Sequence, residues 1–269
     1  MGLKLATLGP EGSFSEIAAK RMFENAEIIF SEDLEEIFFM VEGKEVSYGA
    51  IPVENSLEGS VNLALDLLLE RDVKICKEVI LNIEHCLLAL PGVKIEDINL
   101  VMSHPHALAQ CRKFIKKLGV KTKSCASTSE AAKEIMEKNL KNVAAIAPEV
   151  AAEVYNLEIL KKGVQDRASQ TRFIAIAKKD AEFSGKDKTS IIFGLRDKPG
   201  ALWRVLGIFA REKINLTKIE SRPSKKSLGD YIFYVDFEGH RKENEIKKVL
   251  EDMKKETTFI KILGSYPKS

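Results

Sequence analysis

The chain has 269 residues, of which 45% are hydrophobic and 30% are charged, and its formal net charge at pH 7 is +2. This length and apolar content are enough for two or three compact units with filled cores. The near balance of charges excludes a broad basic face for nucleic acid, so an acidic small substrate would need local cations instead.

The sequence predicts a cytoplasmic protein. Its apolar start is interrupted at Gly9-Pro10, too early for the core of a signal peptide, and no apolar run approaches the roughly 20 residues that span a bilayer. The four cysteines lie far apart and form no C-x-x-C pair: Cys76, Cys86, Cys111 and Cys125. We therefore expect no membrane segment, no disulfide and no structural zinc.

Short apolar runs and amphipathic stretches alternate through the first 71 residues, which is the pattern of strands and helices in turn. We expect strands at residues 3–8, 28–30 and 48–52 and helices at 15–25, 34–41 and 61–71. The glycine-bearing turn at residues 9–12 opens the first helix, where free backbone N–H groups can receive an anion. Such a turn can also simply redirect the chain, and the pattern alone leaves both interpretations open.

Asn55 and Ser56 follow the third expected strand. Open α/β sheets bind ligands beyond the C-terminal ends of their strands, so both side chains are candidates for hydrogen bonds to a substrate. The alternative is an Asx-type turn that caps the next helix. For Asn55 we favour the binding role.

The apolar stretch at residues 73–90 predicts an extended strand pair that carries the chain from one lobe to another. We then expect strands at 100–103, 120–124 and 143–147, helices at 105–118, 128–138 and 148–155, and a return crossing near Gln165-Asp166. This alternation predicts parallel α/β layers. Ser127 and Thr128 form either an ordinary helix cap or a second anion-binding helix start. His104 and His106 suggest a metal, but no third ligand accompanies them and we expect none.

The segment Ser169-Gln170-Thr171-Arg172-Phe173 leads into the apolar run at residues 173–177, at the expected start of a strand. Arg172 can hold a carboxylate through a two-pronged pair of hydrogen bonds, and Thr171 offers a neutral O–H to a departing oxygen. The alternative is an ordinary strand start, where β-propensity favours threonine.

A polar linker at residues 182–188 precedes a unit of different organisation. Strands expected at 189–195, 215–221, 230–237 and 258–263, with helices at 201–212 and 244–253, give the order βαββαβ of a ferredoxin-like unit. At Pro199-Gly200 bare backbone opens the first of these helices, which either receives the carboxylate of a small ligand or only starts a helix.

Three segments precede Thr171-Arg172-Phe173 in a fixed order: Gly9-Pro10-Glu11-Gly12-Ser13-Phe14-Ser15, Pro52-Val53-Glu54-Asn55-Ser56-Leu57-Glu58-Gly59 and Ser103-His104-Pro105-His106-Ala107-Leu108-Ala109-Gln110-Cys111. Together they resemble the prephenate dehydratase family. Two further segments resemble the motifs of that family's ACT regulatory domain: Gly200-Ala201-Leu202-Trp203 and Glu220-Ser221-Arg222-Pro223. The likeness covers nearly the whole chain.

The resemblance implies an α/β fold in two parts. A catalytic domain at residues 1–183 would have two lobes, similar to type II periplasmic binding proteins, with the cleft between them. One lobe is expected at about 1–80 and 166–183 and the other at about 81–165. A ferredoxin-like ACT domain would follow at residues 188–269.

The family's reaction converts prephenate to phenylpyruvate, with loss of carbon dioxide and water, on the way to L-phenylalanine, and it uses no metal or other cofactor. The resemblance implies a catalytic set of Thr171, Asn55, Ser103 and Gln110 and a substrate-binding set of Arg172, Phe173, Ser56, Ser13, Ser127 and Thr128. His106 and Ser169 depart from the family pattern, in which glutamine and asparagine are commoner.

The resemblance also implies feedback regulation by L-phenylalanine in a homodimer or homotetramer. The effector-binding residues would be Gly200, Ala201, Leu202, Asn215, Leu216, Glu220, Ser221 and Arg222.

Two other functions stay open. An arogenate dehydratase would apply the same chemistry to a substrate whose keto group is replaced by an amine. A non-catalytic amino-acid-sensing binding protein would share the two lobes, but it gives the hydroxyl and guanidinium of Thr171-Arg172 no role, and a solute receptor would need an export signal.

Overall fold

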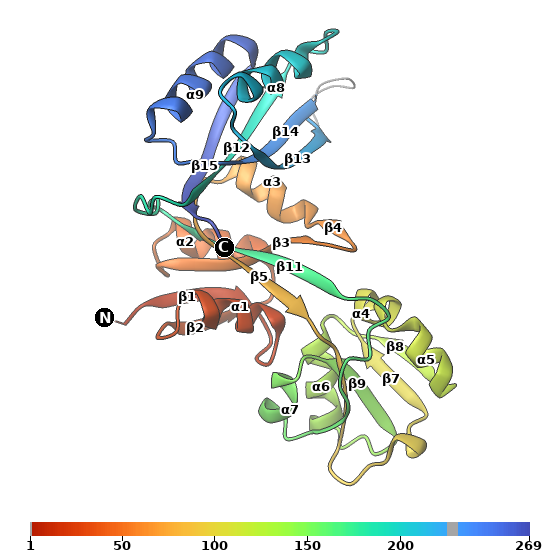
Figure 1. Cartoon of the computed structure of the whole chain (residues 1–269). Helices are drawn as coiled ribbons and strands as arrows, with labels where there is room; N and C mark the ends of the chain where they lie inside the picture. The colour runs from red at the N-terminus through yellow and green to blue at the C-terminus, as the bar shows by residue number, and fades with distance from the viewer. Residues whose placement is uncertain (1, 225–230) are drawn as a thin grey trace.

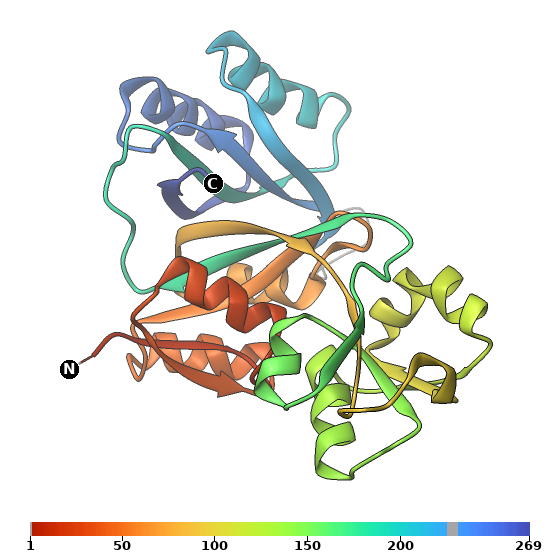
Figure 2. The same ribbon diagram turned by 60° about the horizontal axis from the view of Figure 1, so that its bottom comes forward.

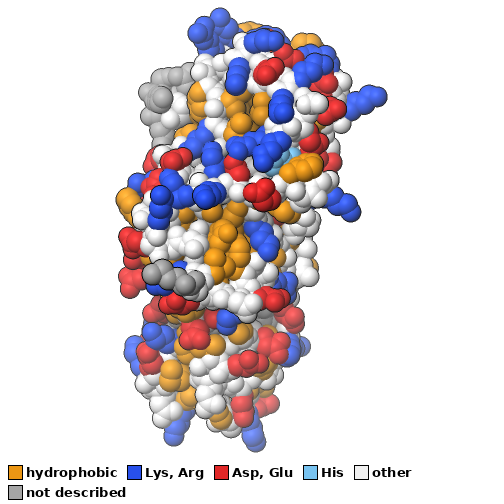
Figure 3. Space-filling view, turned by 90° about the vertical axis from the view of Figure 1, so that its left-hand side faces the viewer, with side chains coloured by type: hydrophobic (Ala, Val, Ile, Leu, Met, Phe, Trp, Pro, Cys, Tyr) orange, Lys and Arg blue, Asp and Glu red, His pale blue; other side chains and the backbone are white. Residues whose placement is uncertain are grey.

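The computed structural model describes residues 2–224 and 231–269 and stacks three units along its length (Figure 1). A first lobe lies in the middle, between a second lobe and a C-terminal unit. Figure 2 shows the second lobe joined to the first by extended segments of the chain. On the face shown in Figure 3, basic and acidic side chains are intermingled over all three units, in keeping with the balanced composition.

The first lobe is a mixed sheet in the order β2-β1-β3-β11-β5, with β4 paired to β3. Its strands are β1 (Lys4–Leu8), β2 (Glu27–Ser31), β3 (Tyr48–Asn55), β4 (Gly59–Ser60), β5 (Lys74–Ile83) and β11 (Ser169–Ala177). Its helices are α1 (Phe14–Met22), α2 (Leu34–Glu42) and α3 (Asn62–Glu70). Strand β1 is parallel to β2 and β3, whereas β11 is antiparallel to β3 and β5.

The second lobe is a sheet in the order β10-β6-β9-β7-β8. Its strands are β6 (Cys86–Ala89), β7 (Leu100–Ser103), β8 (Lys121–Ser124), β9 (Val143–Ala147) and β10 (Glu158–Lys161). Its helices are α4 (Pro105–Gln110), α5 (Arg112–Leu118), α6 (Thr128–Glu137) and α7 (Val150–Val154), with a 3-10 turn η1 (Ile95–Asp97). Strand β9 is apolar and buried along its whole length, as expected for a central strand covered on both faces.

The C-terminal unit is an antiparallel sheet in the order β13-β14-β12-β15. Its strands are β12 (Asp187–Leu195), β13 (Leu216–Pro223), β14 (Tyr231–Glu238) and β15 (Phe259–Pro267), and its helices are α8 (Ala201–Arg211) and α9 (Asn244–Glu256). Both helices lie on the face away from the first lobe (Figure 1). The other face packs on the first lobe, where Ile192, Tyr234 and Leu263 join a core cluster with Leu65 and Ile75. The sheet is therefore covered on both faces except at β13, where alternate side chains such as Ile219 remain exposed.

The α/β fold class and the order of the main elements predicted from the sequence are confirmed. The sheets are mixed rather than purely parallel. The expected helix at 105–118 is divided at Cys111, which has φ −108° and ψ 19° and separates α4 from α5. The extended run at 73–90 is divided between two sheets as β5 and β6. Asp230, the first residue of one expected strand, lies outside the described residues.

Candidate active site

A cleft of about 610 Å³ lies between the two lobes, within the size range of small-molecule sites. Strand ends, loops and helix starts of both lobes line it: Leu8, Gly9, Ser13, Phe14, Ser15, Pro52, Asn55, Glu58, Gly59, Ser60, Val61, Asn62, Ile83, His85, His104, His106, Ala107, Gln110, Ala126, Ser127, Thr128 and Thr171. Neither lysine nor arginine is found among these lining residues of the described chain. The local cations expected from the composition are therefore not found in this lining, and backbone N–H groups and neutral side chains are the donors that it offers to an anion.

Thr171 and Asn55 face each other where β11 and β3 pair. Two backbone donors orient the Asn55 amide, since its Oδ1 accepts from the N–H of Leu57 at 2.9 Å and of Glu58 at 3.1 Å. Its Nδ2 consequently donates to Thr171 Oγ1, at 2.9 Å. Because the Thr171 oxygen accepts this bond, its own O–H remains available to donate elsewhere. The pair presents one neutral, oriented donor to the cleft.

Helices from opposite lobes begin at the cleft. Ser13 caps α1 and Ser127 caps α6, and each hydroxyl accepts from the third N–H of its helix. The first two N–H groups of a helix have no partner within it, and Phe14, Ser15 and Thr128 in these positions line the cleft. Such N–H groups and the helix dipole favour an anion. The two helix starts therefore suit a ligand with two carboxylates, one held at each start.

The lobes touch each other beside the turn at residues 9–12. Ser129 Oγ donates to the Gly12 carbonyl at 2.8 Å, and the Tyr155 O–H donates to the Glu11 carbonyl at 2.6 Å. Gly12 has φ +79°, and a Cβ there would lie 3.1 Å from the Cα of Ala151, so the turn and the close approach both favour glycine. These contacts hold the lobes together around the cleft.

His85 also lines the cleft, although the sequence analysis did not single it out. It is 3% exposed, its ring packs edge-on against Phe14 with centroids 5.6 Å apart, and its Nδ1 has no hydrogen-bond partner among the described residues. Burial lowers the pKa of His85 to about 4, against a smaller opposing effect of Gln110. His85 is therefore a neutral imidazole near pH 7. The available signal was the polar Glu84-His85 pair within an apolar run.

Six predicted site residues come together at the cleft: Thr171, Asn55, Gln110, Ser13, Ser127 and Thr128. Gln110 belongs to the second lobe, and its Nε2 lies 3.5 Å from Oε1 of Glu58 in the first. His104 and His106 also line the cleft. Burial, and then the neighbouring His106, lower the pKa of His104.

The structure corrects the placement of Arg172. Successive side chains of a strand point to opposite faces, so Arg172 faces away from the cleft that Thr171 lines. Its guanidinium forms ion pairs with Glu78 of β5 and Asp236 of β14, and none of its hydrogen-bond partners in the described part of the chain lines the cleft. The predicted bond from Arg172 to a substrate carboxylate is replaced by bonds to protein carboxylates.

Three other predicted site residues also lie elsewhere. Ser103 is fully buried, and its Oγ donates to the Ile146 carbonyl at 2.5 Å, because β7 carries it into the interior of the second lobe. Phe173 is 2% exposed and packs in the core against α1. Ser56 is exposed, and its Oγ accepts from the N–H of Gln170 at 2.9 Å, which ties its loop to β11.

The predicted effector residues are divided between the two faces of the C-terminal sheet. Gly200 has φ +77° at the start of α8, where Ala201 and Leu202 border a hollow of about 110 Å³. Ser221 pairs with Phe233, another residue of that hollow, and shares its face. Glu220 and Arg222 point to the other face, where they bond to Ser60 and Asp66 of the first lobe. Asn215 and Leu216 lie at the start of β13, where the Asn215 carbonyl accepts from the N–H of Glu238 at 3.0 Å.

No group of three or more His, Cys, Asp or Glu side chains within the described ranges is arranged to hold a metal ion. The described helices likewise include none with the length and apolar character needed to cross a bilayer.

Comparison with known proteins agrees with this architecture. Residues 5–181 match the family model for prephenate dehydratase, and residues 189–254 match that for the ACT domain. The bifunctional chorismate mutase/prephenate dehydratase of Aquifex aeolicus is 45% identical over 271 residues, covering 99% of this chain and 74% of the relative. The prephenate dehydratase of Methanocaldococcus jannaschii is 43% identical over 267 residues, covering 96% of each chain. An arogenate dehydratase/prephenate dehydratase of Arabidopsis thaliana is 41% identical over 278 residues, covering 98% of this chain and 73% of the relative.

Solved structures agree over nearly the full length. Prephenate dehydratase from Arthrobacter aurescens in complex with L-Phe has a TM-score of 0.90 and 32% identity, covering 99% of this chain and 90% of that one. GqqA, described as a novel type of quorum quenching acylase, has a TM-score of 0.91 and 30% identity, covering 99% and 98%.

Fold and cleft thus define a two-lobed α/β catalytic domain joined to an ACT domain. The chain belongs to the prephenate dehydratase family.

Proposed function

We propose that this protein converts prephenate to phenylpyruvate, releasing carbon dioxide and water, and that L-phenylalanine regulates it through the ACT domain. The observation that carries the proposal is the Thr171 hydroxyl, which accepts from Asn55 and is left free to donate at a cleft between two helix starts. Prephenate is a dianion with a leaving hydroxyl, and these are the features that such a cleft complements.

In the reaction the substrate takes up one proton, the ring carboxylate leaves as carbon dioxide and the ring hydroxyl leaves as water. The two electrons of the broken carbon–carbon bond enter the ring as the carbon–oxygen bond breaks, and aromatisation supplies the driving force. A donor at the departing oxygen is stabilising mainly as charge develops there, so it lowers the barrier rather than only tightening binding. The Thr171 O–H fills this role.

Loss of carbon dioxide disperses the charge of the ring carboxylate, so a tight cation at that group would stabilise the ground state more than the transition state. The described residues that line the cleft include no lysine or arginine, which suits this requirement. We assign substrate binding to Ser13, Ser127, Thr128 and Gln110 from the predicted set and add His85. We assign no substrate contact to Arg172, Ser103, Phe173 or Ser56.

The first experiment is turnover of prephenate, followed by the ultraviolet absorbance of phenylpyruvate, with arogenate in parallel. The related Arabidopsis enzyme is named for both activities, so the two substrates must be compared directly. We expect a higher kcat/KM for prephenate. A clear preference for arogenate would assign the second activity, and turnover of neither would leave the amino-acid-sensing function.

The likeness to GqqA does not favour acyl transfer in this cleft. A nucleophilic hydroxyl needs a base that accepts its proton, whereas the described partner of Thr171 Oγ1 is an amide donor.

We further propose a homodimer or homotetramer in which ACT domains complete each other's effector sites. The hollow at Ala201 and Leu202 holds about 110 Å³, well below the roughly 300 Å³ at which ligand pockets begin. Tyr231 borders the hollow and Trp203 follows Leu202 in α8, and both side chains are exposed and available to a second copy. Light scattering after size-exclusion chromatography tests the assembly, and calorimetry with L-phenylalanine tests the site.

We also propose a cytoplasmic location, which the four free cysteines support.

A further inference from the structure

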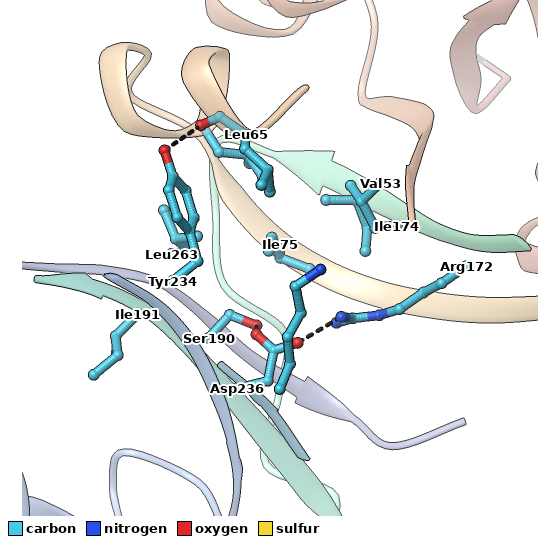
Figure 4. A pocket seen from close by; sticks show the side chains of 12 residues that line it. Val53, Leu65, Ile75, Arg172, Ile174, Ser190, Ile191, Tyr234, Asp236 and Leu263 are labelled. Atoms are coloured by element: carbon cyan, nitrogen blue, oxygen red, sulfur yellow. Dashed lines mark hydrogen bonds and ion pairs between the residues drawn. The ribbon is translucent and has the colours of Figure 1, made fainter. Parts of the chain in front are cut away.

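Strand β11 has a different partner on each face at its catalytic end. Thr171 lines the cleft and bonds to Asn55. The next residue, Arg172, points to the opposite face and reaches the C-terminal sheet (Figure 4). The pairing of β11 with β3 shifts register between Arg172 and Phe173, so the strand is irregular at this point. A displacement of Arg172 therefore acts on the backbone that carries Thr171.

The Arg172 guanidinium uses all three nitrogens in hydrogen bonds. Its Nε donates to Glu78 Oε2 at 2.8 Å, its Nη1 to Asp236 Oδ2 at 2.5 Å and its Nη2 to the Tyr266 hydroxyl at 2.7 Å. Lys188 also donates to Glu78 Oε1, at 2.8 Å. The side chains of Arg172, Asp236 and Glu78 are 12%, 10% and 1% exposed, so solvent screens these pairs only weakly.

Burial by itself would lower the pKa of Arg172, but Asp236, then Tyr266 and Glu78, raise it overall. The guanidinium is therefore charged, and its partners fix its position. A bidentate or branched network of this kind cannot be reproduced by lysine, which offers a single point charge.

Successive side chains of the C-terminal strands likewise point alternately toward the effector hollow and toward the first lobe. Phe233 borders the hollow, whereas Tyr234 and Asp236 lie on the face toward the first lobe. On β13, Glu220 of that same face bonds to Ser60, which lines the catalytic cleft. A movement of these strands at the hollow therefore also moves residues that touch the catalytic lobe.

The space beside the Arg172–Asp236 pair holds about 20 Å³ and is lined by side chains such as Ile75, Ile174 and Leu263 (Figure 4). This is room for about one water molecule and not for a metabolite. Closely packed elements transmit a shift rather than absorb it. The network is therefore a joint between the domains and not a second binding site.

We propose that Arg172 is a positioning residue, which couples the state of the ACT sheet to the orientation of Thr171 through its bond to Asp236. This inference rests on the proposed dehydratase function and deepens it, since it names the contact through which an effector alters turnover. Arg172 touches neither substrate nor effector.

Asp236→Asn tests the coupling from the far side of the joint. The variant keeps an oxygen for the bond that Asp236 Oδ1 accepts from Ser190 Oγ at 2.5 Å, but it removes one of the two carboxylate charges that hold Arg172. The matched control is Asp180→Asn, which removes an equal charge from the Asp180–Arg241 pair, at the other end of β11 and also between the domains.

We expect Asp236→Asn to lower kcat for prephenate about tenfold with little change in KM, and to weaken the inhibition by L-phenylalanine about tenfold. Arg172→Lys should resemble it, and Asp180→Asn should stay within about twofold of the unmodified protein. If Arg172→Lys instead raises KM while Asp236→Asn behaves as the control, Arg172 binds substrate and the proposal is wrong.

Hydrogen–deuterium exchange gives a readout that does not depend on turnover. The amides of residues 169–174 should exchange faster in Asp236→Asn than in the unmodified protein or in Asp180→Asn, with circular dichroism confirming that all three are folded. Unchanged exchange in Asp236→Asn, together with unchanged kcat, would overturn the coupling. Failure of the unmodified protein to turn over prephenate would refute the proposed function alone, because the exchange comparison would still test the coupling through Arg172.

Discussion

Asn55 decides where the Thr171 hydroxyl can point. Its Oδ1 is occupied by the N–H groups of Leu57 and Glu58, so its Nδ2 must face Thr171 and donate. The reactive property of Thr171 is thus set by an amide whose orientation is fixed by its own loop. A buried, neutral His85 adds a second polar group that carries no charge near pH 7.

Replacing Asn55 by aspartate should reverse the direction of the bond to Thr171. A carboxylate accepts the Thr171 O–H and withdraws it from the substrate, while still accepting from Leu57 and Glu58. We expect kcat for prephenate to fall by about 10² to 10³. The measurement is steady-state kinetics of phenylpyruvate formation. An Asn55→Asp variant with unchanged kcat would show that the orientation of the Thr171 hydroxyl does not matter.

His85 should make the protein less stable in mild acid. The ordinary pKa of histidine is 6.5, and burial lowers that of His85 to about 4. Between these values the unfolded chain binds more protons than the folded one, so stability falls as pH drops from 6.5 toward 4. The loss amounts to roughly 3 kcal/mol when complete. Urea unfolding at a series of pH values should show a shallower decline in His85→Gln, and an equal decline would assign the effect to other groups.

At the scale of elements, the site depends on strands whose two faces do different work. β11 sets Thr171 against the cleft and Arg172 against the ACT sheet, and β13 and β14 alternate in the same way. The packing of β15 against β5 completes this joint. A Cβ on Gly264 would lie 2.1 Å from the carbonyl oxygen of Ile75, so these two strands approach each other more closely than any side chain permits.

Gly264→Ala should therefore loosen the joint between the domains. The strands must separate to admit the methyl group, and overpacking of this kind costs about 1–3 kcal/mol. Thermal unfolding should show a lower Tm, with increased proteolysis in residues 182–186, which precede β12. The control is Gly207→Ala in α8, where the nearest atom to a new Cβ, apart from the helix backbone and the two chain neighbours, is 3.8 Å away and alanine favours the helix. An unchanged Tm in Gly264→Ala would contradict the close contact.

The sequence predicts where these strands lie more accurately than it predicts which of their side chains face the cleft. The run of residues 173–177 is apolar throughout because β11 is covered on both sides, so no alternation indicates which of Thr171 and Arg172 faces the cleft. Ser103 is similar, since it ends a strand that is buried by the second lobe. His85 was hidden in a run interpreted as one extended pair. Asn55 and Ser127 were recognisable because turns and helix caps have local chemical signatures, whereas Ser13 was predicted only through the family resemblance.

At the scale of the whole molecule, the ACT domain is part of the support of the catalytic lobe. Ile192, Tyr234 and Tyr266 belong to one core cluster with residues of the first lobe. Lys261 of β15 donates to the carbonyls of Leu69 and Arg71 at the end of α3, which fixes that helix from outside. Regulation and structural support therefore share one interface.

Truncation after Phe183 should lower kcat and abolish the response to L-phenylalanine. Arg172 loses Asp236 and Tyr266, and apolar side chains such as Ile75 and Leu65 become exposed. We expect measurable turnover with kcat reduced about tenfold and a lower Tm than the full chain. Calorimetry should detect no binding of L-phenylalanine. Equally tight binding to the truncated and full chains would place the effector site outside the ACT domain.

The most direct test of the account is the rate of phenylpyruvate formation from prephenate in the unmodified protein and in Thr171→Val, which keeps the shape of the side chain and removes the hydroxyl. We predict turnover by the unmodified protein and a kcat lower by about 10² to 10⁴ in the variant, equivalent to roughly 3–5 kcal/mol of barrier, with KM changed little. A folded Thr171→Val protein that retains near-full turnover would contradict the assignment of the chemistry to this hydroxyl.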